Sequence, residues 1–131
     1  MNVVVVGYAP GPIGDAALDR AVAEARLRDG RLVVVNSSRG DALVDNRYLQ
    51  EDEVRELGRR LDATEVPWTL HQPVRGRDAA EEVLQAAEDS RADLLVIGLR
   101  HRSPVGKLIM GSTAQRVLLD ARCPVLAVKA R

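Results

Sequence analysis

Aromatic residues are almost missing from this sequence of 131 residues, which contains one Trp, two Tyr and no Phe. Its core must therefore be built from Val, Leu, Ile and Ala. Proteins that hold single-stranded nucleic acid usually stack bases on aromatic side chains in a basic groove. Net charge is also lacking, because 19 Lys and Arg residues balance 19 Asp and Glu residues. A chain without net positive charge is not attracted as a whole to nucleic acid or to an anionic membrane, and neither is expected as a partner.

Cysteine and long apolar runs are scarce as well. The single cysteine, Cys123, excludes an internal disulfide, and we expect it to be a buried thiol. No apolar run approaches the roughly 20 residues that cross a bilayer. The N-terminal residues lack the basic region and cleavage site of a signal peptide. These absences predict a cytoplasmic protein, and the length fits one domain over residues 1–131.

Short apolar runs alternate with longer segments of helical period. The runs predict strands at residues 3–6, 32–35, 68–74, 94–97 and 125–128. The periodic segments predict helices at residues 15–28 and 45–64, a helix that begins after Asp78, and a last helix at 112–121. Asp78 is a predicted N-cap because Glu81 follows it at the spacing of a capping box.

The order of these elements predicts the fold. Strands separated by helices pair in parallel through right-handed crossovers. The strands at 3–6 and 94–97 are the most apolar and should be central, whereas Pro73 places the strand at 68–74 at an edge. The predicted class is α/β, with an open parallel five-stranded sheet of order 3-2-1-4-5 and helices on both faces. Its switch point lies between strands one and four, where ligands bind in such sheets, and this directs attention to the loops after Gly7 and Gly98.

The loop at residues 98–113 carries the clearest functional signal. It leaves a buried strand and ends at a predicted helix N-terminus, where Gly111 allows close backbone approach. Backbone N–H groups at Ser112 and Thr113 would form an anion site that the helix dipole supports. Ser112 is also a predicted N-cap. From residue 94 to residue 119 there is no Asp or Glu, and the cations in this stretch are Arg100, Arg102, Lys107 and Arg116.

The same loop resembles the universal stress protein family. That family carries G-x-x-G, nine residues, and then Gly followed by Ser or Thr. Here Gly98 is followed by His101 at the second glycine position and by Gly111-Ser112 at the matching spacing. The segment at 123–128, CPVLAV, is similar to the family's closing strand, and the resemblance covers essentially the whole chain. It implies an adenine nucleotide alpha hydrolase-like fold.

The resemblance implies that the chain binds ATP or a related adenine nucleotide and has a regulatory role in stress responses. Mg²⁺ or Mn²⁺ would be carried by the phosphates, with no metal ligand from protein side chains. The implied nucleotide-binding residues are Gly7, Tyr8, Ala9, Asn36, Gly98, Arg100, His101, Arg102, Ser103, Gly111, Ser112 and Thr113. A homodimer through the last strand is also implied, and an uncovered apolar edge favours such pairing. The strand residues are Val125, Leu126, Ala127 and Val128.

Two departures from the family pattern keep an alternative open. ATP-binding members usually have Asp where this chain has Ala9, and His101 replaces a glycine. Both favour a nucleotide-free dimeric interaction module of the same fold. No Ser-His-Asp or Cys-His set is readable, so we expect no enzyme activity beyond slow ATP hydrolysis.

Overall fold

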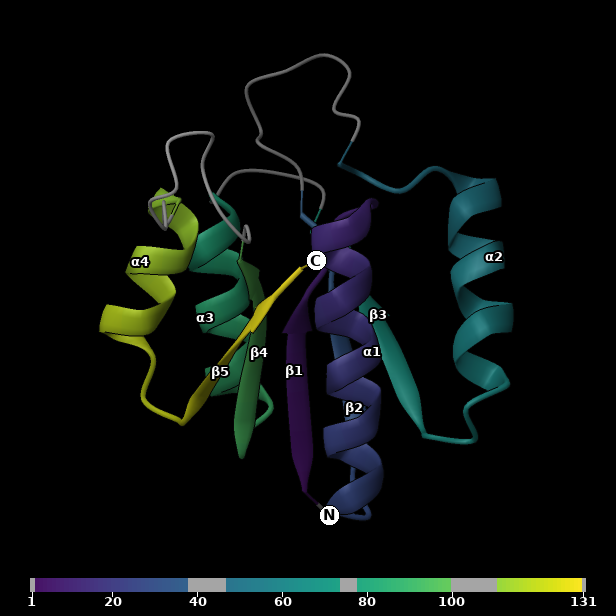
Figure 1. The fold of residues 1–131 in the computed structure, drawn as a ribbon, viewed down its shortest axis with the longest axis horizontal. Coiled ribbons are helices and arrows are strands. Elements are labelled where there is room, and N and C mark those ends of the chain that lie inside the picture. Colours follow the sequence, from purple (N-terminus) through teal and green to yellow (C-terminus); the bar gives the residue numbers. More distant parts are fainter. Residues whose placement is uncertain (1, 38–46, 74–77, 100–110, 131) are drawn as a thin grey trace.

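The computed structural model describes residues 2–37, 47–73, 78–99 and 111–130, in which strands and helices alternate (Figure 1). The strands are β1 Val3–Gly7, β2 Arg31–Val35, β3 Trp68–His71, β4 Leu94–Leu99 and β5 Val125–Lys129. The helices are α1 Pro12–Leu27, α2 Glu51–Asp62, α3 Ala79–Asp89 and α4 Ser112–Asp120.

The strands form one parallel sheet in the order β3-β2-β1-β4-β5, which confirms the predicted class and strand order. Strand β1 lies in the middle, where Val5 is in register with Val33 of β2 and Leu95 of β4. Val4, Val5 and Val6 are fully buried. A parallel strand that is covered on both faces is expected to be apolar throughout, and β1 is.

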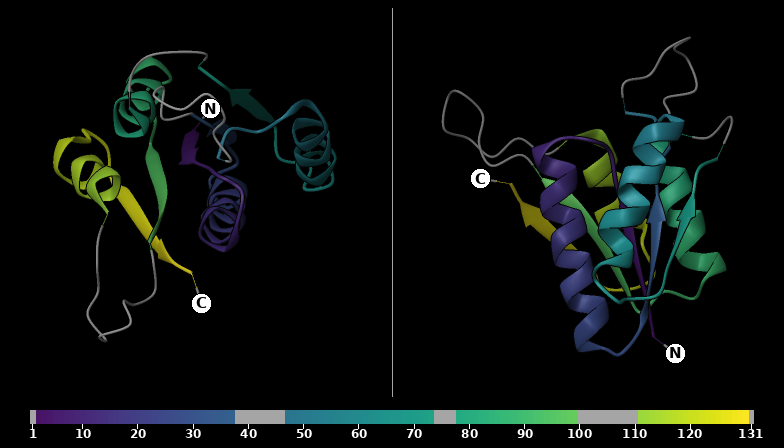
Figure 2. Two further views of the ribbon diagram at one scale, coloured as in Figure 1. Left: turned by 90° about the horizontal axis from the view of Figure 1, so that it is seen from above. Right: turned by 90° about the vertical axis from the view of Figure 1, so that its right-hand side faces the viewer.

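Helices cover both faces of the sheet, as predicted. Alternate residues of β1 face opposite sides, so Val4 packs in one core cluster with Leu18 of α1 and Leu61 of α2. Val5 packs in the other cluster, with Val83 of α3 and Val117 of α4 among its members. Seen from above, α3 and α4 lie on one side of the strands and α1 on the other (Figure 2).

Three predicted boundaries differ from the structure by three residues or more. Helix α1 begins at Pro12 instead of residue 15, because proline is favoured in the first helical turn and Gly11 supplies the required backbone turn with a φ of +123°. Strand β3 ends at His71, so Pro73 lies beyond the sheet. Helix α2 is shorter than the predicted helix at 45–64 and begins after Gln50, which exchanges capping hydrogen bonds with Glu53.

The two predicted N-caps have different outcomes. Asp78 caps α3 as expected, because its Oδ1 accepts a hydrogen bond of 2.9 Å from the backbone N–H of Glu81. Ser112 is not a cap. Gly111 occupies the N-cap position of α4 without a side-chain hydrogen bond, and Ser112 is the first helical residue. The prediction for Ser112 was therefore wrong by one residue.

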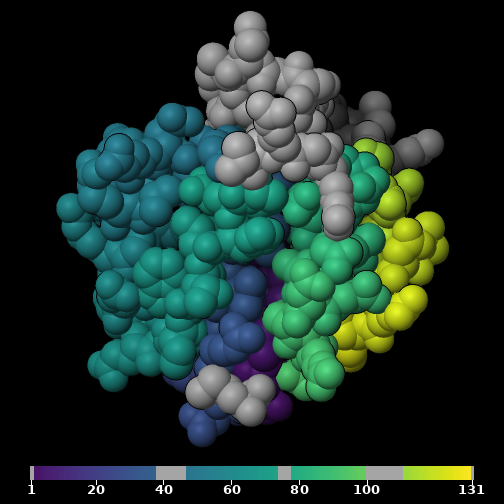
Figure 3. Space-filling view, turned by 180° about the vertical axis from the view of Figure 1, so that it is seen from behind, coloured from purple at the N-terminus to yellow at the C-terminus, as the bar shows by residue number. Residues whose placement is uncertain are grey.

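The two sheet edges lie at opposite sides of the molecule. From behind, the teal segments of α2 and β3 are at one side and the yellow segments of α4 and β5 at the other (Figure 3).

Cys123, just before β5, is half-buried instead of buried, and this partial burial raises the pKa of its thiol. None of the described helices combines the length and apolar character needed to span a membrane.

Candidate functional site

A cavity of about 620 Å³ lies at the carboxyl ends of β1 and β4. This is the switch point of the sheet, where the chain leaves β1 toward α1 and leaves β4 in the opposite direction. The described residues that line it are Gly7, Tyr8, Ala9, Pro10, Ile13, Gly14, Val35, Ser37, Arg47, Ala79, Val83, Ile97, Gly98, Leu99, Gly111, Thr113, Ala114 and Val117.

Half of the predicted nucleotide-binding residues line this cavity. They are Gly7, Tyr8, Ala9, Gly98, Gly111 and Thr113. The structure thus brings the end of β1, the end of β4 and the first turn of α4 around one space, although they are far apart in the sequence. The predicted residues Arg100, His101, Arg102 and Ser103 lie outside the described residues.

Two predicted residues lie elsewhere. Ser112 is exposed and is not part of the cavity wall. Asn36 is fully buried and also absent from the wall, and its amide forms hydrogen bonds to other parts of the protein. Asn36 therefore lies behind the residues that line the cavity, and its side chain is turned to partners within the protein.

Gly98 and Gly111, the two glycines of the family pattern, have opposite surroundings. A Cβ at Gly98 would lie 2.6 Å from the carbonyl oxygen of Ile13, so only glycine lets β4 approach the start of α1. A Cβ at Gly111 would meet no atom of the described residues within 4 Å, and its φ of −68° is open to any residue. Gly98 is thus needed by the fold, whereas space beside Gly111 is left for something other than the described protein atoms.

Tyr8 is held at the cavity wall by a charged network. Its hydroxyl donates a hydrogen bond of 3.1 Å to Asp15, and Arg60 of α2 bridges Asp15 at 3.0 Å and Asp19 at 2.8 Å. Burial, the charge of Asp15 and this hydrogen bond raise the pKa of Tyr8 to about 12. The phenol is therefore neutral near pH 7 and can act as a hydrogen-bond donor but not as a base.

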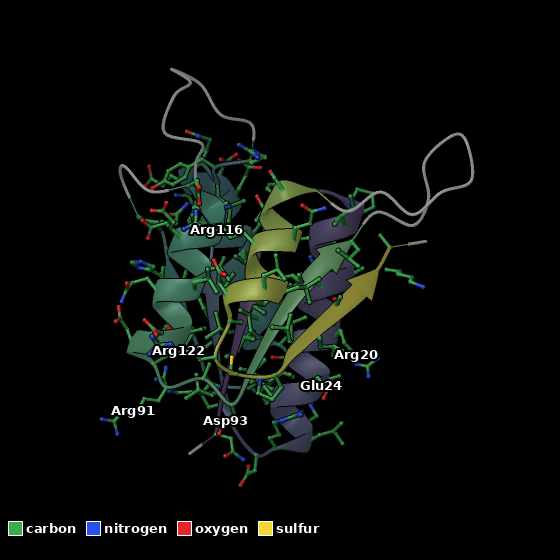
Figure 4. The ribbon with its side chains drawn as sticks, turned by 90° about the vertical axis from the view of Figure 1, so that its left-hand side faces the viewer. Arg20, Glu24, Arg91, Asp93, Arg116 and Arg122 are labelled. Atoms are coloured by element: carbon green, nitrogen blue, oxygen red, sulfur yellow. The ribbon has the colours of Figure 1, made fainter. Side chains whose placement is uncertain are left out.

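Arg116 does not contribute a free positive charge to the cavity rim. It lies on α4 beside α3 (Figure 4), where its Nη1 is 3.1 Å from both Asp78 and Glu81. Its Nε is also 3.6 Å from Asp120. Hydrogen bonding to Glu81 and the neighbouring carboxylates raise the Arg116 pKa. Asp78 and Glu81 come from the start of α3, far from Arg116 in the sequence, and Asp120 lies one residue beyond the acid-free stretch at 94–119.

Several lining residues were missed by sequence reasoning. Ser37 and Arg47 add polar groups, and Ser37 could have been found because it follows β2 at the same end of the sheet. Ile13 and Gly14 were overlooked because the predicted helix begins at residue 15, whereas α1 begins at Pro12. Val83 comes from α3, whose place in the cavity wall depends on packing that periodicity does not reveal.

The arrangement suits a ligand with an apolar part and an anionic part. Six of the eighteen described lining residues are valine, isoleucine or leucine, and glycine, alanine and proline make up most of the rest. The first turn of α4 borders the same space, and N–H groups in a first helical turn lack partners within their helix and attract anions. Within the ranges that the structure describes, no three His, Cys, Asp or Glu side chains are grouped so that they could hold a metal ion.

Fold and site together define an open parallel α/β protein with a ligand cavity at its switch point. The model of the universal stress protein family matches residues 1–129. A universal stress protein of Mycolicibacterium smegmatis is 50% identical over 126 residues, which cover 96% of each chain. The chain belongs to the universal stress protein family.

Solved structures agree with this assignment. A universal stress protein from Archaeoglobus fulgidus is 31% identical, with a TM-score of 0.74 and 98% of each chain covered. A universal stress protein of the same organism in complex with dAMP is 25% identical, with a TM-score of 0.65 and 98% of each chain covered. These relatives have the same fold along almost the entire chain.

Proposed function

We propose that this protein binds an adenine nucleotide, ATP or a related one, in the cavity at the ends of β1 and β4. The observation that carries the proposal is the space beside Gly111 that no described residue occupies, bordered by the first turn of α4 and next to an apolar cavity. A relative from Archaeoglobus fulgidus whose structure contains dAMP supports this choice of ligand.

The two ends of the cavity suggest how the nucleotide would lie. The base and sugar would contact apolar side chains such as Val35, Val83 and Ile97. The phosphates would lie toward Gly111 and Thr113, where the dipole of α4 favours negative charge. Mg²⁺ or Mn²⁺, if bound, would be carried by the phosphates. The roles predicted for Arg100, His101, Arg102 and Ser103 belong to this proposal.

A regulatory role fits the site better than an enzymatic one. Catalysis of hydrolysis needs a base placed beside a nucleophile. Among the lining residues that the structure describes, Tyr8 is the hydroxyl paired with a carboxylate, and its pKa of about 12 makes the phenolate rare. We therefore propose at most slow ATP hydrolysis, with binding itself as the signal in a stress response.

We further propose that the protein is a homodimer through Val125, Leu126, Ala127 and Val128. Strand β5 is at the end of the sheet, and these four residues are only half-buried. On the neighbouring helix α4, Leu119 is 83% exposed. A second copy would pair with the edge strand and cover apolar surface, and light scattering that shows a strict monomer at tens of micromolar would contradict this.

One observation supports the alternative of a nucleotide-free dimeric module. Ala9 lies in the cavity wall where ATP-binding members of the family usually carry Asp, so a carboxylate for ribose or metal is missing there. In that case the purified protein would release no nucleotide, and calorimetric titration with AMP or ATP would produce no heat of binding.

Two variants test the nucleotide site without disturbing the fold. Gly111→Val places bulk in space that no described atom occupies. Ser112→Asp adds a negative charge to the first turn of α4, which stabilises a helix by about 0.3–1 kcal/mol but repels a phosphate. We expect both variants to lose AMP and ATP binding in calorimetry while their Tm stays equal or rises, with Ser112→Ala as the control. Unchanged affinity in both variants would refute the assigned site.

A further inference from the structure

The side chain of Asn36 is polar and yet fully buried, directly after β2. A buried polar side chain is costly unless its hydrogen-bonding groups find partners. The carboxamide has two N–H donors and an oxygen that accepts two hydrogen bonds. All four positions have partners in the structure, so Asn36 has no capacity left for a ligand.

These four hydrogen bonds join three separate parts of the chain. The amide nitrogen Nδ2 donates to the carbonyl oxygen of Tyr8 at 3.0 Å and to that of Arg47 at 2.7 Å. The oxygen Oδ1 accepts from the backbone N–H of Leu49 at 2.9 Å and from Nε2 of Gln72 at 2.9 Å. Gln72 reinforces the arrangement, since it also donates to the Leu49 carbonyl oxygen at 3.1 Å.

Two of the residues that Asn36 holds are in the cavity wall. Tyr8 follows β1, and Arg47 lies in the segment that leads into α2; both line the cavity, whereas Asn36 stands behind them. The contact also brings Leu49, which is buried in the core beside α2, to a fixed distance from β2. A single side chain thus links the end of β1 to the segment that precedes α2.

We propose that Asn36 is a positioning residue, which fixes Tyr8 and the segment 47–49 against the cavity and thereby sets the cavity's width. Its effect on ligand affinity rests on the proposed nucleotide function, but its effect on the wall does not. The residue type follows from the geometry, because only a carboxamide presents donors to two carbonyl oxygens and an acceptor to two N–H groups here. An aspartate would place a carboxylate oxygen against the Tyr8 and Arg47 carbonyl oxygens.

The test compares variants that remove different numbers of these bonds. Asn36→Asp loses both donors. Gln72→Ala removes one partner of Oδ1 together with the hydrogen bond from Gln72 to the Leu49 carbonyl oxygen, and it serves if Asn36→Asp does not fold. The control is Val3→Ala, a core change at the opposite end of β1 from the cavity. Urea denaturation measures the free energy of unfolding of each variant. The loss of AMP binding in each variant can then be compared with its loss of stability.

Two readouts separate positioning from mere stability. Native-state hydrogen exchange should show the Leu49 amide exchanging about ten-fold faster or more in Asn36→Asp, relative to the Val5 amide in the same protein, and less so in Gln72→Ala. Calorimetry should show AMP bound about ten-fold more weakly by Asn36→Asp and within about two-fold of wild type by Val3→Ala.

Each outcome has a defined meaning. If the Leu49 amide keeps its relative protection in both Asn36→Asp and Gln72→Ala, Asn36 does not hold the wall and the inference is wrong. If Val3→Ala and Asn36→Asp weaken AMP binding equally, the effect is only loss of stability, which also overturns the inference. If the wild-type protein does not bind AMP, the proposed function fails, and the exchange rates alone decide whether Asn36 positions the wall.

Discussion

Substitution of Gly98 by alanine tests whether close packing between β4 and α1 shapes the cavity. The added Cβ would lie 2.6 Å from the Ile13 carbonyl oxygen and 2.7 Å from its Cγ2 atom, whereas ordinary contacts begin at 3.4 Å. The first turn of α1 would have to withdraw by roughly 0.8 Å in a densely packed interior. Ile13 and Gly98 both line the cavity, so this movement would also change its shape.

The expected cost follows from this overlap. Overpacking of this kind costs about 1–3 kcal/mol, which lowers Tm by roughly 4–12 °C for a chain of this length. Gly111→Ala is the matched control. Its Cβ would meet no atom of the described part of the chain within 4 Å. The gain from a less flexible unfolded chain offsets poorer capping, so its stability should stay within about 0.5 kcal/mol of wild type.

Calorimetric melting and urea denaturation of the two variants measure the difference. We expect Gly98→Ala to be clearly destabilised and Gly111→Ala to unfold like wild type. Equal destabilisation of the two variants, or wild-type stability of Gly98→Ala, would refute the reasoning that one glycine serves packing and the other leaves space.

Three further changes have predictable effects on stability. Asp78→Ala removes the N-cap of α3 and should cost about 1 kcal/mol in urea denaturation. Because the pKa of Tyr8 rises from 10.0 to about 12 on folding, stability should fall as the pH rises from 10 to 12, and Tyr8→Phe should lack this component in denaturation at several pH values. Hydrogen bonds from Arg28 and Arg20 lower the pKa of Glu24 below its usual 4.5, so acid should remove stability as the pH falls from about that value, and Glu24→Gln should flatten the acid limb of the same curve.

The fold could be predicted from local patterns because the residues of each segment indicate whether that segment forms a strand or a helix. The valine run at 3–6 and the apolar run at 94–97 identified the central strands. The edge position of β3 was predicted correctly, but Pro73, the reason given for it, lies beyond the strand. The start of α1 was missed by three residues because glycine and proline, as at Gly11 and Pro12, are typical of turns, whereas proline is equally common in a first helical turn. Local composition alone does not separate these two roles.

The site was predictable only in part because it depends on contacts between distant segments. Parallel topology places the ends of β1 and β4 together, so Gly7 and Gly98 could be found from the sequence. The partners of Arg116 on α3 could not, since no local pattern relates the two helices. Asn36 was located correctly at the end of β2, but its complete burial among four hydrogen-bond partners depends on the return of the chain at residues 47–49.

Amide chemical shifts recorded by NMR during a titration with AMP test the central claim most directly. The account predicts that the amides of Gly98, Gly111 and Thr113 shift together and saturate with one affinity, while those of Gly30 and Val66, at the opposite end of the sheet, stay in place. Absence of any shift, or shifts confined to the end that contains Gly30, would contradict a nucleotide site at the switch point.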